Sequence, residues 1–315
     1  MMNIKVVVTS KSFSMNKELV RDLRQHFCDV KINDKGVVFN PRSLIEFISD
    51  ASAAIIGLEE IDDEILKACP NLKIVSKYGV GLDNINMNAC EAHDVRIGWT
   101  GGVNRLSVAE MALGFMLSLS RNLYTTSNLL KKNIWLKDGG TQLSEKVIGI
   151  IGVGYIGKEL IRLLRPFKCK ILVNDIINQD EFYHKVGALK VSKEEIFKQS
   201  DIITIHAPLT LETENLINKE TLNLMKSTAL LINTARGKIV HLQDLNEALG
   251  QGQIAGAALD VYPEEPVLNE PLLKHENIIN TPHIGGNSAE AVLAMGRSSI
   301  EHLTKFFKNS VKLKA

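Results

Sequence analysis

Short apolar runs alternate with amphipathic stretches along most of the chain. In the first hundred residues the apolar runs cover residues 4–10, 51–58, 72–81 and 94–100. Residues 61–69, between the second and the third apolar run, have a helical pattern that begins with Asp62 and Asp63. The partial positive charge of a helix N-terminus favours acidic residues there. Strands that alternate with helices predict a parallel sheet covered by helices, and therefore the α/β fold class.

The same alternation returns from Val147, after an interruption at Gly101–Gly102. Its apolar runs cover residues 147–151, 170–175, 200–208, 229–237, 254–262 and 276–286, and an amphipathic helix is predicted over residues 288–307. The intervening stretch 106–123 is apolar nearly all round. Such a helix must be buried between domains, against another subunit or in the core of one subunit. The pattern predicts two α/β units.

Length and composition are those of an ordinary globular protein. The chain has 315 residues, long for one core and sufficient for two, with 45% hydrophobic and 23% charged residues. Lys and Arg total 37 against 36 for Asp and Glu, so no electrostatic footprint for nucleic acid is expected. No apolar run is long enough to cross a membrane, and the N-terminus has the pattern of a strand instead of a signal peptide. We therefore expect a cytoplasmic protein without a membrane partner.

The four cysteines lie far apart in the sequence, and no C-x-x-C pair occurs. Zinc sites and redox pairs normally use closely spaced cysteines. The sequence therefore predicts reduced thiols and no metal site.

A glycine-rich stretch marks the beginning of the second unit. Gly152, Gly154 and Gly157 form a G-x-G-x-x-G pattern between a predicted strand and a predicted helix. In dinucleotide-binding folds such glycines permit a tight turn, close approach to a pyrophosphate and close helix–strand packing. Asp175 ends the next predicted strand, close to the spacing of about twenty residues expected for the acid that binds the ribose. Although glycine turns and exposed strand-end acids are common, the combination favours NAD over NADP.

Polar residues follow four apolar runs of the second unit, at the edge where ligands bind to a parallel sheet. Arg236 offers a planar fork for the carboxylate and carbonyl oxygens of an oxo acid. His283 is suited to proton transfer near neutral pH, and Glu264 or Glu265 could raise its pKa and fix its tautomer. A salt-bridging Arg and a surface His remain alternatives, and His206, His241 and His275 compete for the acid role.

Seven stretches in order carry a resemblance to a known family: residues 77–86, 107–117, 147–157, 206–218, 230–240, 255–266 and 280–286. The chain resembles the D-isomer-specific 2-hydroxyacid dehydrogenase family, and within it the phosphoglycerate dehydrogenase branch. The resemblance implies two Rossmann-like domains: a substrate domain of residues 1–100 and 287–315, and an NAD-binding domain of residues 101–286 inserted into it. Substrate is expected between the two. A homodimer formed through the helix after Gly102 is also implied.

The resemblance further implies roles for individual residues. His283 would be the acid/base, Glu265 its partner and Arg236 the substrate clamp. The implied NAD contacts are Gly152, Gly154, Tyr155, Ile156, Gly157, Asp175, His206, Pro208, Thr213, Thr234, Ala235, Arg236, Asp260, His283 and Gly286. The implied substrate contacts are the backbone N–H groups of Gly79, Val80 and Gly81, which form an anion-binding nest, together with Asn104, Arg236 and Lys77.

The main functional prediction is NAD-dependent oxidation of 3-phosphoglycerate to 3-phosphohydroxypyruvate, as in serine biosynthesis. One departure weighs against it: the first unit carries acids within residues 55–62 where this branch commonly has phosphate-binding arginines, so that Lys77 is the nearby cation. The alternatives are reduction of another small 2-oxo acid, such as 2-oxoglutarate, glyoxylate, hydroxypyruvate or pyruvate, and a non-catalytic NAD(H)-sensing protein like the family's corepressors.

Overall fold

The computed structural model of the chain describes residues 1–268 and 270–312, which form two compact units. Unit 1 contains Met1–Asn104 and the stretch that begins at Ser288, and unit 2 contains Arg105–Asn287. The observed boundary after Asn104 follows a turn over residues 101–104, where the sequence predicts the change of domain. The last three residues of the predicted substrate domain, 313–315, lie outside the described residues.

Unit 1 is built on a five-stranded sheet. Its order is β2 (Phe27–Ile32), β1 (Met2–Val8), β3 (Ala53–Ile56), β4 (Ile74–Lys77) and β5 (Arg96–Gly98). Every neighbouring pair is parallel. The sequence pattern predicts four of these strands and misses β2, in which only Phe27 is fully buried.

Helices cover both faces of the unit 1 sheet. Alternate residues of a strand point to opposite faces, and in β1 both sets include buried valines. Val6 and Val8 belong to the cluster with α1 (Lys11–Met15), α2 (Lys17–His26) and α13 (Ala289–Lys312). Val7 belongs to the cluster with α3 (Pro41–Ile48), α4 (Asp63–Ala68) and α5 (Met87–Ala92). Ser299 of α13 donates to the carbonyl of Lys77 over 2.8 Å, so the last helix is fixed on β4.

Unit 2 is built on a seven-stranded parallel sheet. Its order is β12 (Ile278–Asn280), β11 (Gly256–Leu259), β10 (Leu230–Asn233), β9 (Ile202–Ile205), β6 (Val147–Ile151), β7 (Lys170–Asn174) and β8 (Leu189–Lys190). Neighbouring strands are parallel throughout. The strand order reverses between β6 and β9, and ligands of such sheets bind beyond the carboxyl ends at this switch point. The predicted fold class, two parallel-sheet α/β units with one inserted into the other, is confirmed.

Two groups of helices enclose the unit 2 sheet. On one face lie α6 (Arg105–Ser120) and α8 (Tyr155–Leu164), with α9 (Asp180–Val186) beside them. On the other face lie α10 (Lys193–Gln199), α11 (Lys219–Asn223) and α12 (Leu242–Gly250). Ala112, Phe115 and Met116 bury one side of α6 in this core, whereas Leu106 is exposed. The helix is therefore partly a core helix, and its other side remains open within unit 2.

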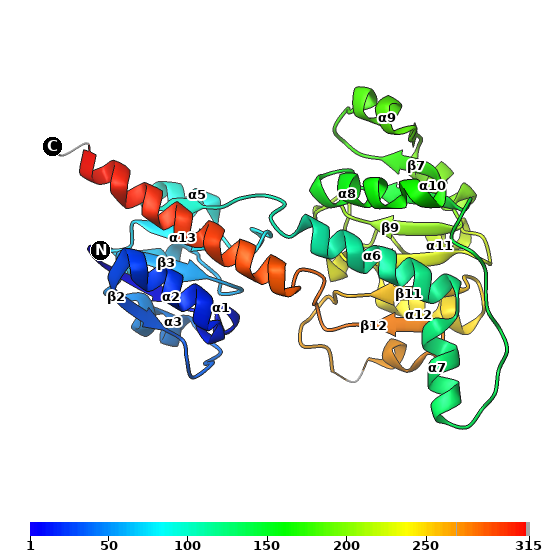
Figure 1. Cartoon of the computed structure of the whole chain (residues 1–315), viewed down its shortest axis with the longest axis horizontal. Coiled ribbons are helices and arrows are strands. Elements are labelled where there is room, and N and C mark those ends of the chain that lie inside the picture. The colour runs from blue at the N-terminus through cyan, green and yellow to red at the C-terminus, as the bar shows by residue number, and fades with distance from the viewer. Residues whose placement is uncertain (269, 313–315) are drawn as a thin grey trace. The chain divides into compact units, whose positions relative to one another are not determined.

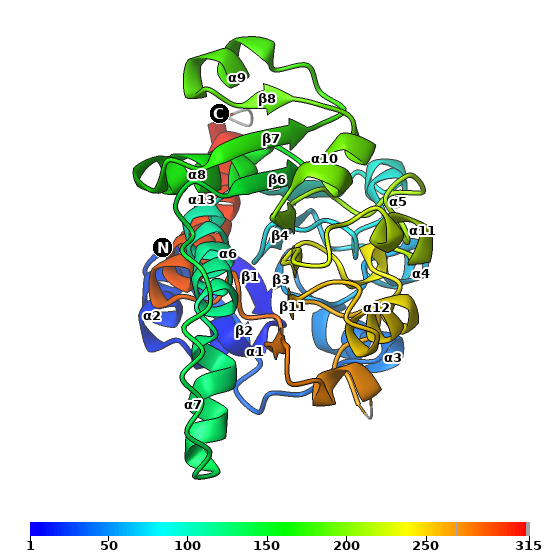
Figure 2. The ribbon, with the colours of Figure 1, turned by 90° about the vertical axis from the view of Figure 1, so that its right-hand side faces the viewer.

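The helix α7 (Leu123–Lys131) projects from unit 2 in both views and buries none of its residues (Figures 1 and 2). Among the described residues, no helix is both long and apolar enough to cross a membrane.

Candidate active site

The three glycines between β6 and α8 occupy three different environments. Gly152 has φ +91°, and a Cβ there would lie 2.5 Å from the Ala207 nitrogen, at the end of β9. A Cβ on Gly157 would lie 2.4 Å from the Gly152 oxygen. These two glycines let the turn, the neighbouring strand and the helix pack closely.

Gly154 differs because a Cβ there would meet nothing within 4 Å. It is the N-cap of α8, and no side chain caps the helix. The start of α8 therefore leaves N–H groups and open space in front of a helix dipole, at the switch point of the sheet. This arrangement fits the pyrophosphate of a dinucleotide.

Asp175 follows β7 and reaches back to the glycine loop. Its carboxylate accepts hydrogen bonds from the Val153 N–H over 2.5 Å and from the Ile177 N–H over 2.7 Å. The carboxylate is half-buried beside the loop, where its remaining lone pairs can accept from ribose hydroxyls. Its negative charge would repel a 2′-phosphate, so the residues present fit NAD.

His283 and Glu265 meet at the same edge of the sheet. Glu265 lies on the loop after β11 and His283 on the loop after β12, and His283 Nδ1 is 2.7 Å from Glu265 Oε2. The other carboxylate oxygen, Oε1, accepts from the Tyr262 N–H over 3.0 Å, which fixes the carboxylate. The carboxylate favours a proton on Nδ1, which faces Glu265, and this leaves Nε2 available for proton exchange.

The pair shifts the pKa values of both groups. The hydrogen bond that His283 donates to Glu265 raises the pKa of His283 above its ordinary value, although burial and the charge of Arg236 lower it. Burial raises the pKa of Glu265, but the hydrogen bonds from His283 and Tyr262 outweigh it, and the net pKa lies below the ordinary value. At neutral pH Glu265 is therefore a carboxylate, and a larger fraction of His283 is protonated than in an isolated histidine.

Asp260, at the end of β11, organises the loop that carries His283. It is 1% exposed and accepts three hydrogen bonds: from Thr281 Oγ1 over 2.6 Å, from the Ile284 N–H over 2.8 Å and from the Gly285 N–H over 2.7 Å. These bonds surround His283, whose φ of +53° is uncommon for a residue with a side chain. The carboxylate that the resemblance assigns to NAD thus also anchors this loop.

Arg236 follows β10 on a loop that the Asn233 side chain holds. Asn233 Nδ2 donates to the Arg236 carbonyl over 2.9 Å, and Asn233 Oδ1 accepts from the Ala235 N–H over 3.0 Å. Arg236 is half-buried, and its Nη1 donates to the Ala235 carbonyl over 2.7 Å. At Gly237 a Cβ would lie 1.9 Å from the Tyr262 carbonyl carbon, so the loops of Arg236 and Glu265 pack directly together.

The competing histidines have other surroundings. His206 Nε2 is 3.0 Å from Thr204 Oγ1 and its Nδ1 is 3.5 Å from Thr234 Oγ1, and burial lowers its pKa to about 4. It is therefore neutral near pH 7 and carries no proton to donate as an imidazolium. His275 precedes β12, at the opposite edge of the sheet from His283, and its Nε2 lies 3.1 Å from Asn246 Oδ1.

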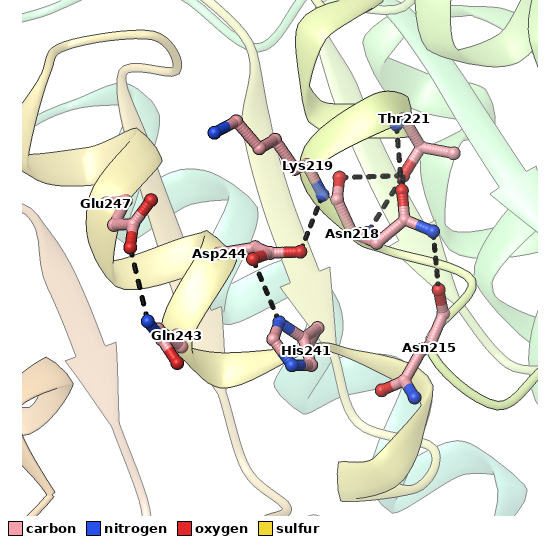
Figure 3. A network of polar contacts seen from close by, with 8 residues as sticks. All are labelled: Asn215, Asn218, Lys219, Thr221, His241, Gln243, Asp244 and Glu247. Carbon is pink, nitrogen blue, oxygen red and sulfur yellow. Dashed lines mark hydrogen bonds and ion pairs between the residues drawn. The ribbon is translucent and has the colours of Figure 1, made fainter.

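His241 belongs to a structural network that joins the starts of α11 and α12 (Figure 3). Its Nδ1 lies 3.0 Å from Asp244 Oδ1, while Asp244 Oδ2 accepts from the Lys219 N–H over 2.7 Å. Asn218 caps α11 by accepting from the Thr221 N–H over 3.1 Å. His283 is thus the histidine with both a carboxylate partner and a place among the other candidate residues.

The remaining predicted NAD contacts follow β6, β9, β10 and β12 at this carboxyl edge: Tyr155 and Ile156, Pro208 and Thr213, Ala235, and Gly286. Thr213 Oγ1 donates to the Pro208 carbonyl over 2.7 Å and shapes that loop. No group of three or more His, Cys, Asp or Glu side chains within residues 1–268 and 270–312 could hold a metal ion.

The predicted substrate contacts Lys77, Gly79, Val80, Gly81 and Asn104 belong to unit 1. Gly79 has φ +144° directly after β4. Among the described residues, no acceptor binds the backbone N–H groups of residues 79–81, and no donor binds the side-chain oxygen of Asn104. Consecutive unpaired N–H groups form a nest that suits a carboxylate.

Comparison with known proteins identifies the family. Residues 113–285, more than half of the chain, match the D-isomer specific 2-hydroxyacid dehydrogenase, NAD binding domain. The chain belongs to the D-isomer specific 2-hydroxyacid dehydrogenase family. The resemblance deduced from the sequence is therefore confirmed, and the protein is an NAD-dependent oxidoreductase of D-2-hydroxy acids.

Relatives within this dehydrogenase family differ in their named substrates. A glyoxylate reductase of Thermococcus onnurineus is 35% identical over 98% of this chain and 95% of its own length. A D-3-phosphoglycerate dehydrogenase of Methanocaldococcus jannaschii is 33% identical over 85% of this chain but only 52% of its own length. The crystal structure of a putative D-isomer specific 2-hydroxyacid dehydrogenase from Polaromonas has a TM-score of 0.89, with 25% identity over 98% of both chains.

Sequence reasoning missed several residues that hold the candidate residues of each unit in place. The Tyr262 N–H fixes Glu265, the Gln179 side chain donates to the Val153 carbonyl over 3.1 Å, and Trp99 Nε1 donates to the Val80 carbonyl over 2.8 Å. A backbone donor leaves no signal in the sequence. The sequence did carry a signal for Trp99, which stands at the end of a predicted strand. The indole N–H of a partly buried tryptophan usually has a hydrogen-bond partner.

Proposed function

We propose that the protein reduces a small, unphosphorylated 2-oxo acid, glyoxylate or hydroxypyruvate, with NADH as the hydride donor. The observation that carries the proposal is the likeness to glyoxylate reductases over nearly the full length of both chains. The sequence-based preference for 3-phosphoglycerate has weaker support, since the phosphoglycerate dehydrogenase named above is matched over about half of its length.

The surroundings of Lys77 also favour an unphosphorylated substrate. Lys77 is the cation that the sequence offers as a phosphate contact, but it is only 6% exposed. Its ammonium donates to the Gly57 carbonyl over 2.5 Å and to Asn84 Oδ1 over 2.6 Å. A buried ammonium that already has these acceptors is poorly suited to a bulky dianion.

The chemistry follows from the groups at the carboxyl edge of unit 2. When bound, NADH supplies the hydride that reduces the carbonyl carbon. Arg236 polarises and orients the 2-oxo acid through its guanidinium. Protonated His283 donates from Nε2 to the carbonyl oxygen, while Glu265 holds the Nδ1 proton and stabilises the imidazolium. The N–H groups of Gly79, Val80 and Gly81 are assigned to the substrate carboxylate, and in oxidation His283 accepts the hydroxyl proton.

We also propose that the protein is a homodimer. The helix α7 and the segment after it expose several large apolar side chains: Leu123, Tyr124, Leu130, Ile134, Trp135 and Leu136. The half-open face of α6 lies in the same part of the chain. Neighbouring exposed apolar side chains of this number are typical of an interface. Sedimentation equilibrium should give twice the chain mass, and a monomer at micromolar concentration would contradict the assignment.

The test of the function is NADH oxidation with a panel of acids: glyoxylate, hydroxypyruvate, pyruvate, 2-oxoglutarate and 3-phosphohydroxypyruvate. The His283→Ala variant, purified in parallel, measures any background from contaminating reductases. The proposal predicts the highest kcat/KM for glyoxylate or hydroxypyruvate. A clear preference for 3-phosphohydroxypyruvate would restore the phosphoglycerate prediction, and NADH binding without turnover of any acid would favour a sensing protein.

A further inference from the structure

Two side chains from neighbouring strands hold the nest of residues 79–81 in unit 1. Trp99, after β5, donates from Nε1 to the Val80 carbonyl over 2.8 Å. Lys77, the last residue of β4, lies beneath the turn: a Cβ on Gly79 would be 3.2 Å from Lys77 Cε. Neither side chain needs to touch a ligand in order to influence how the nest binds one.

The contact of Trp99 fixes the direction of a backbone donor. The Val80 carbonyl and the Gly81 N–H belong to one planar trans peptide unit, in which the C=O and N–H bonds point in opposite directions. When the indole holds the carbonyl, the Gly81 N–H is directed away from the indole. Without this hydrogen bond the peptide unit between Val80 and Gly81 can rotate, because the glycine on one side of it restricts the backbone little.

The contacts of Lys77 fix the other side of the turn. Its ammonium joins the Gly57 carbonyl, after β3, to the Asn84 side chain, after the nest. Asn84 Nδ2 also donates to the Glu59 carbonyl over 2.5 Å. The loops after β3 and β4 are thus tied together around one buried ammonium group.

We propose that Lys77 and Trp99 are positioning residues for the substrate carboxylate. Trp99 orients the Gly81 N–H, and Lys77 braces the turn that carries the three N–H groups. This inference rests on the proposed function, since it assumes that a 2-oxo acid binds through its carboxylate at residues 79–81. It replaces the predicted role of Lys77 as a phosphate contact by one directed at the carboxylate common to all 2-oxo acids.

The test compares Trp99→Phe, Lys77→Met and Lys77→Arg with the wild-type protein. Trp99→Phe keeps an aromatic ring and removes the N–H donor, and Lys77→Arg keeps the charge. The control is Lys73→Met, since Lys73 is an exposed lysine four positions earlier in the chain. The readouts are KM and kcat for glyoxylate, and the dissociation constant of oxamate, a carboxylate analogue that is not reduced, for the NADH-bound enzyme. NADH affinity and thermal unfolding are measured on the same samples.

We expect Trp99→Phe to raise the KM for glyoxylate and the oxamate dissociation constant by about 3–10-fold, as for one neutral hydrogen bond. We expect Lys77→Met to raise both by more than about tenfold, as for hydrogen bonds to a charged group, and Lys77→Arg to recover part of the loss. In all three variants kcat should stay within about twofold of the wild-type value, and the NADH affinity should be unchanged, because the reacting groups of unit 2 are not altered.

Two outcomes separate this inference from the proposed function. If the wild-type protein reduces glyoxylate and the variants keep wild-type KM and oxamate affinity, or lose kcat and thermal stability alone, the inference is wrong and the function stands. If the wild-type protein reduces no 2-oxo acid of the panel, the proposed function is wrong, and the inference fails with it.

Discussion

The pairing of His283 with Glu265 predicts a specific change in pH dependence when the carboxylate is neutralised. In Glu265→Gln the side chain keeps its shape and an acceptor oxygen but loses its charge. Because the hydrogen bond to Glu265 is the largest cause of the raised pKa of His283, we expect this pKa to fall. Reduction requires protonated His283, so the decline of its rate with rising pH should move to lower pH.

The size of the shift follows from the contact. A hydrogen bond to a charged group contributes about 1.5–3 kcal/mol, and one pKa unit corresponds to about 1.4 kcal/mol. His283 and Glu265 side chains are 44% and 32% exposed, so solvent screens part of the interaction. We therefore expect a shift on the order of one pKa unit. Above the pKa of the wild-type histidine the variant should be about tenfold slower, and at low pH the two rates should converge.

The assay is kcat/KM for glyoxylate reduction between pH 5 and 9 at constant ionic strength. Glu264→Gln is the matched control, because Glu264 is the neighbouring carboxylate and, among the described residues, forms no hydrogen bond or ion pair with His283. An unchanged profile in Glu265→Gln, or the same shift in Glu264→Gln, would refute the assignment of Glu265. A pH-independent loss of rate would show that Glu265 acts on the geometry of His283 instead of its proton affinity.

Three further substitutions test the rest of the site. Asp175→Ala should reduce the preference for NADH over NADPH, because it removes the charge that repels a 2′-phosphate; an unchanged ratio of the two kcat/KM values would contradict the ribose assignment. Arg236→Lys should lower kcat/KM for glyoxylate by about 10–100-fold, since a point charge cannot replace a bidentate fork; near-wild-type kinetics would exclude the clamp. Asp260→Asn should lower the free energy of unfolding by about 1–3 kcal/mol, because a buried N–H of the His283 loop loses its acceptor; urea denaturation measures it, and a stability equal to wild type would contradict the anchoring role.

The elements of the fold could be predicted where the apolar pattern is strong. The strand over residues 147–151 has the predicted bounds, and the other predicted strands of unit 2 are shorter than their apolar runs but in the same places. β2 could not be predicted because Asp29 and Lys31 interrupt its apolar residues, and only Phe27 of its six residues is fully buried. A strand at the edge of a sheet needs few apolar residues.

The sequence predicts those residues of the candidate site that come directly after a parallel strand. The positions of Arg236, Asp260 and His283 after three parallel strands already place them at one edge of a sheet. The choice between Glu264 and Glu265 could not be made from spacing, because it depends on which carboxylate points toward His283. That direction is set by the Tyr262 N–H, a backbone contact that the sequence does not reveal.

The most direct test of the account is NADH oxidation with glyoxylate by the wild-type protein and by His283→Ala, together with the NADH dissociation constant of each. The account predicts turnover by the wild-type protein, a kcat lowered by about 10²–10⁴-fold in the variant, and nearly equal NADH affinities. Equal rates in the two proteins would remove His283 from the chemistry, and a wild-type protein without activity on glyoxylate or hydroxypyruvate would contradict the proposed function.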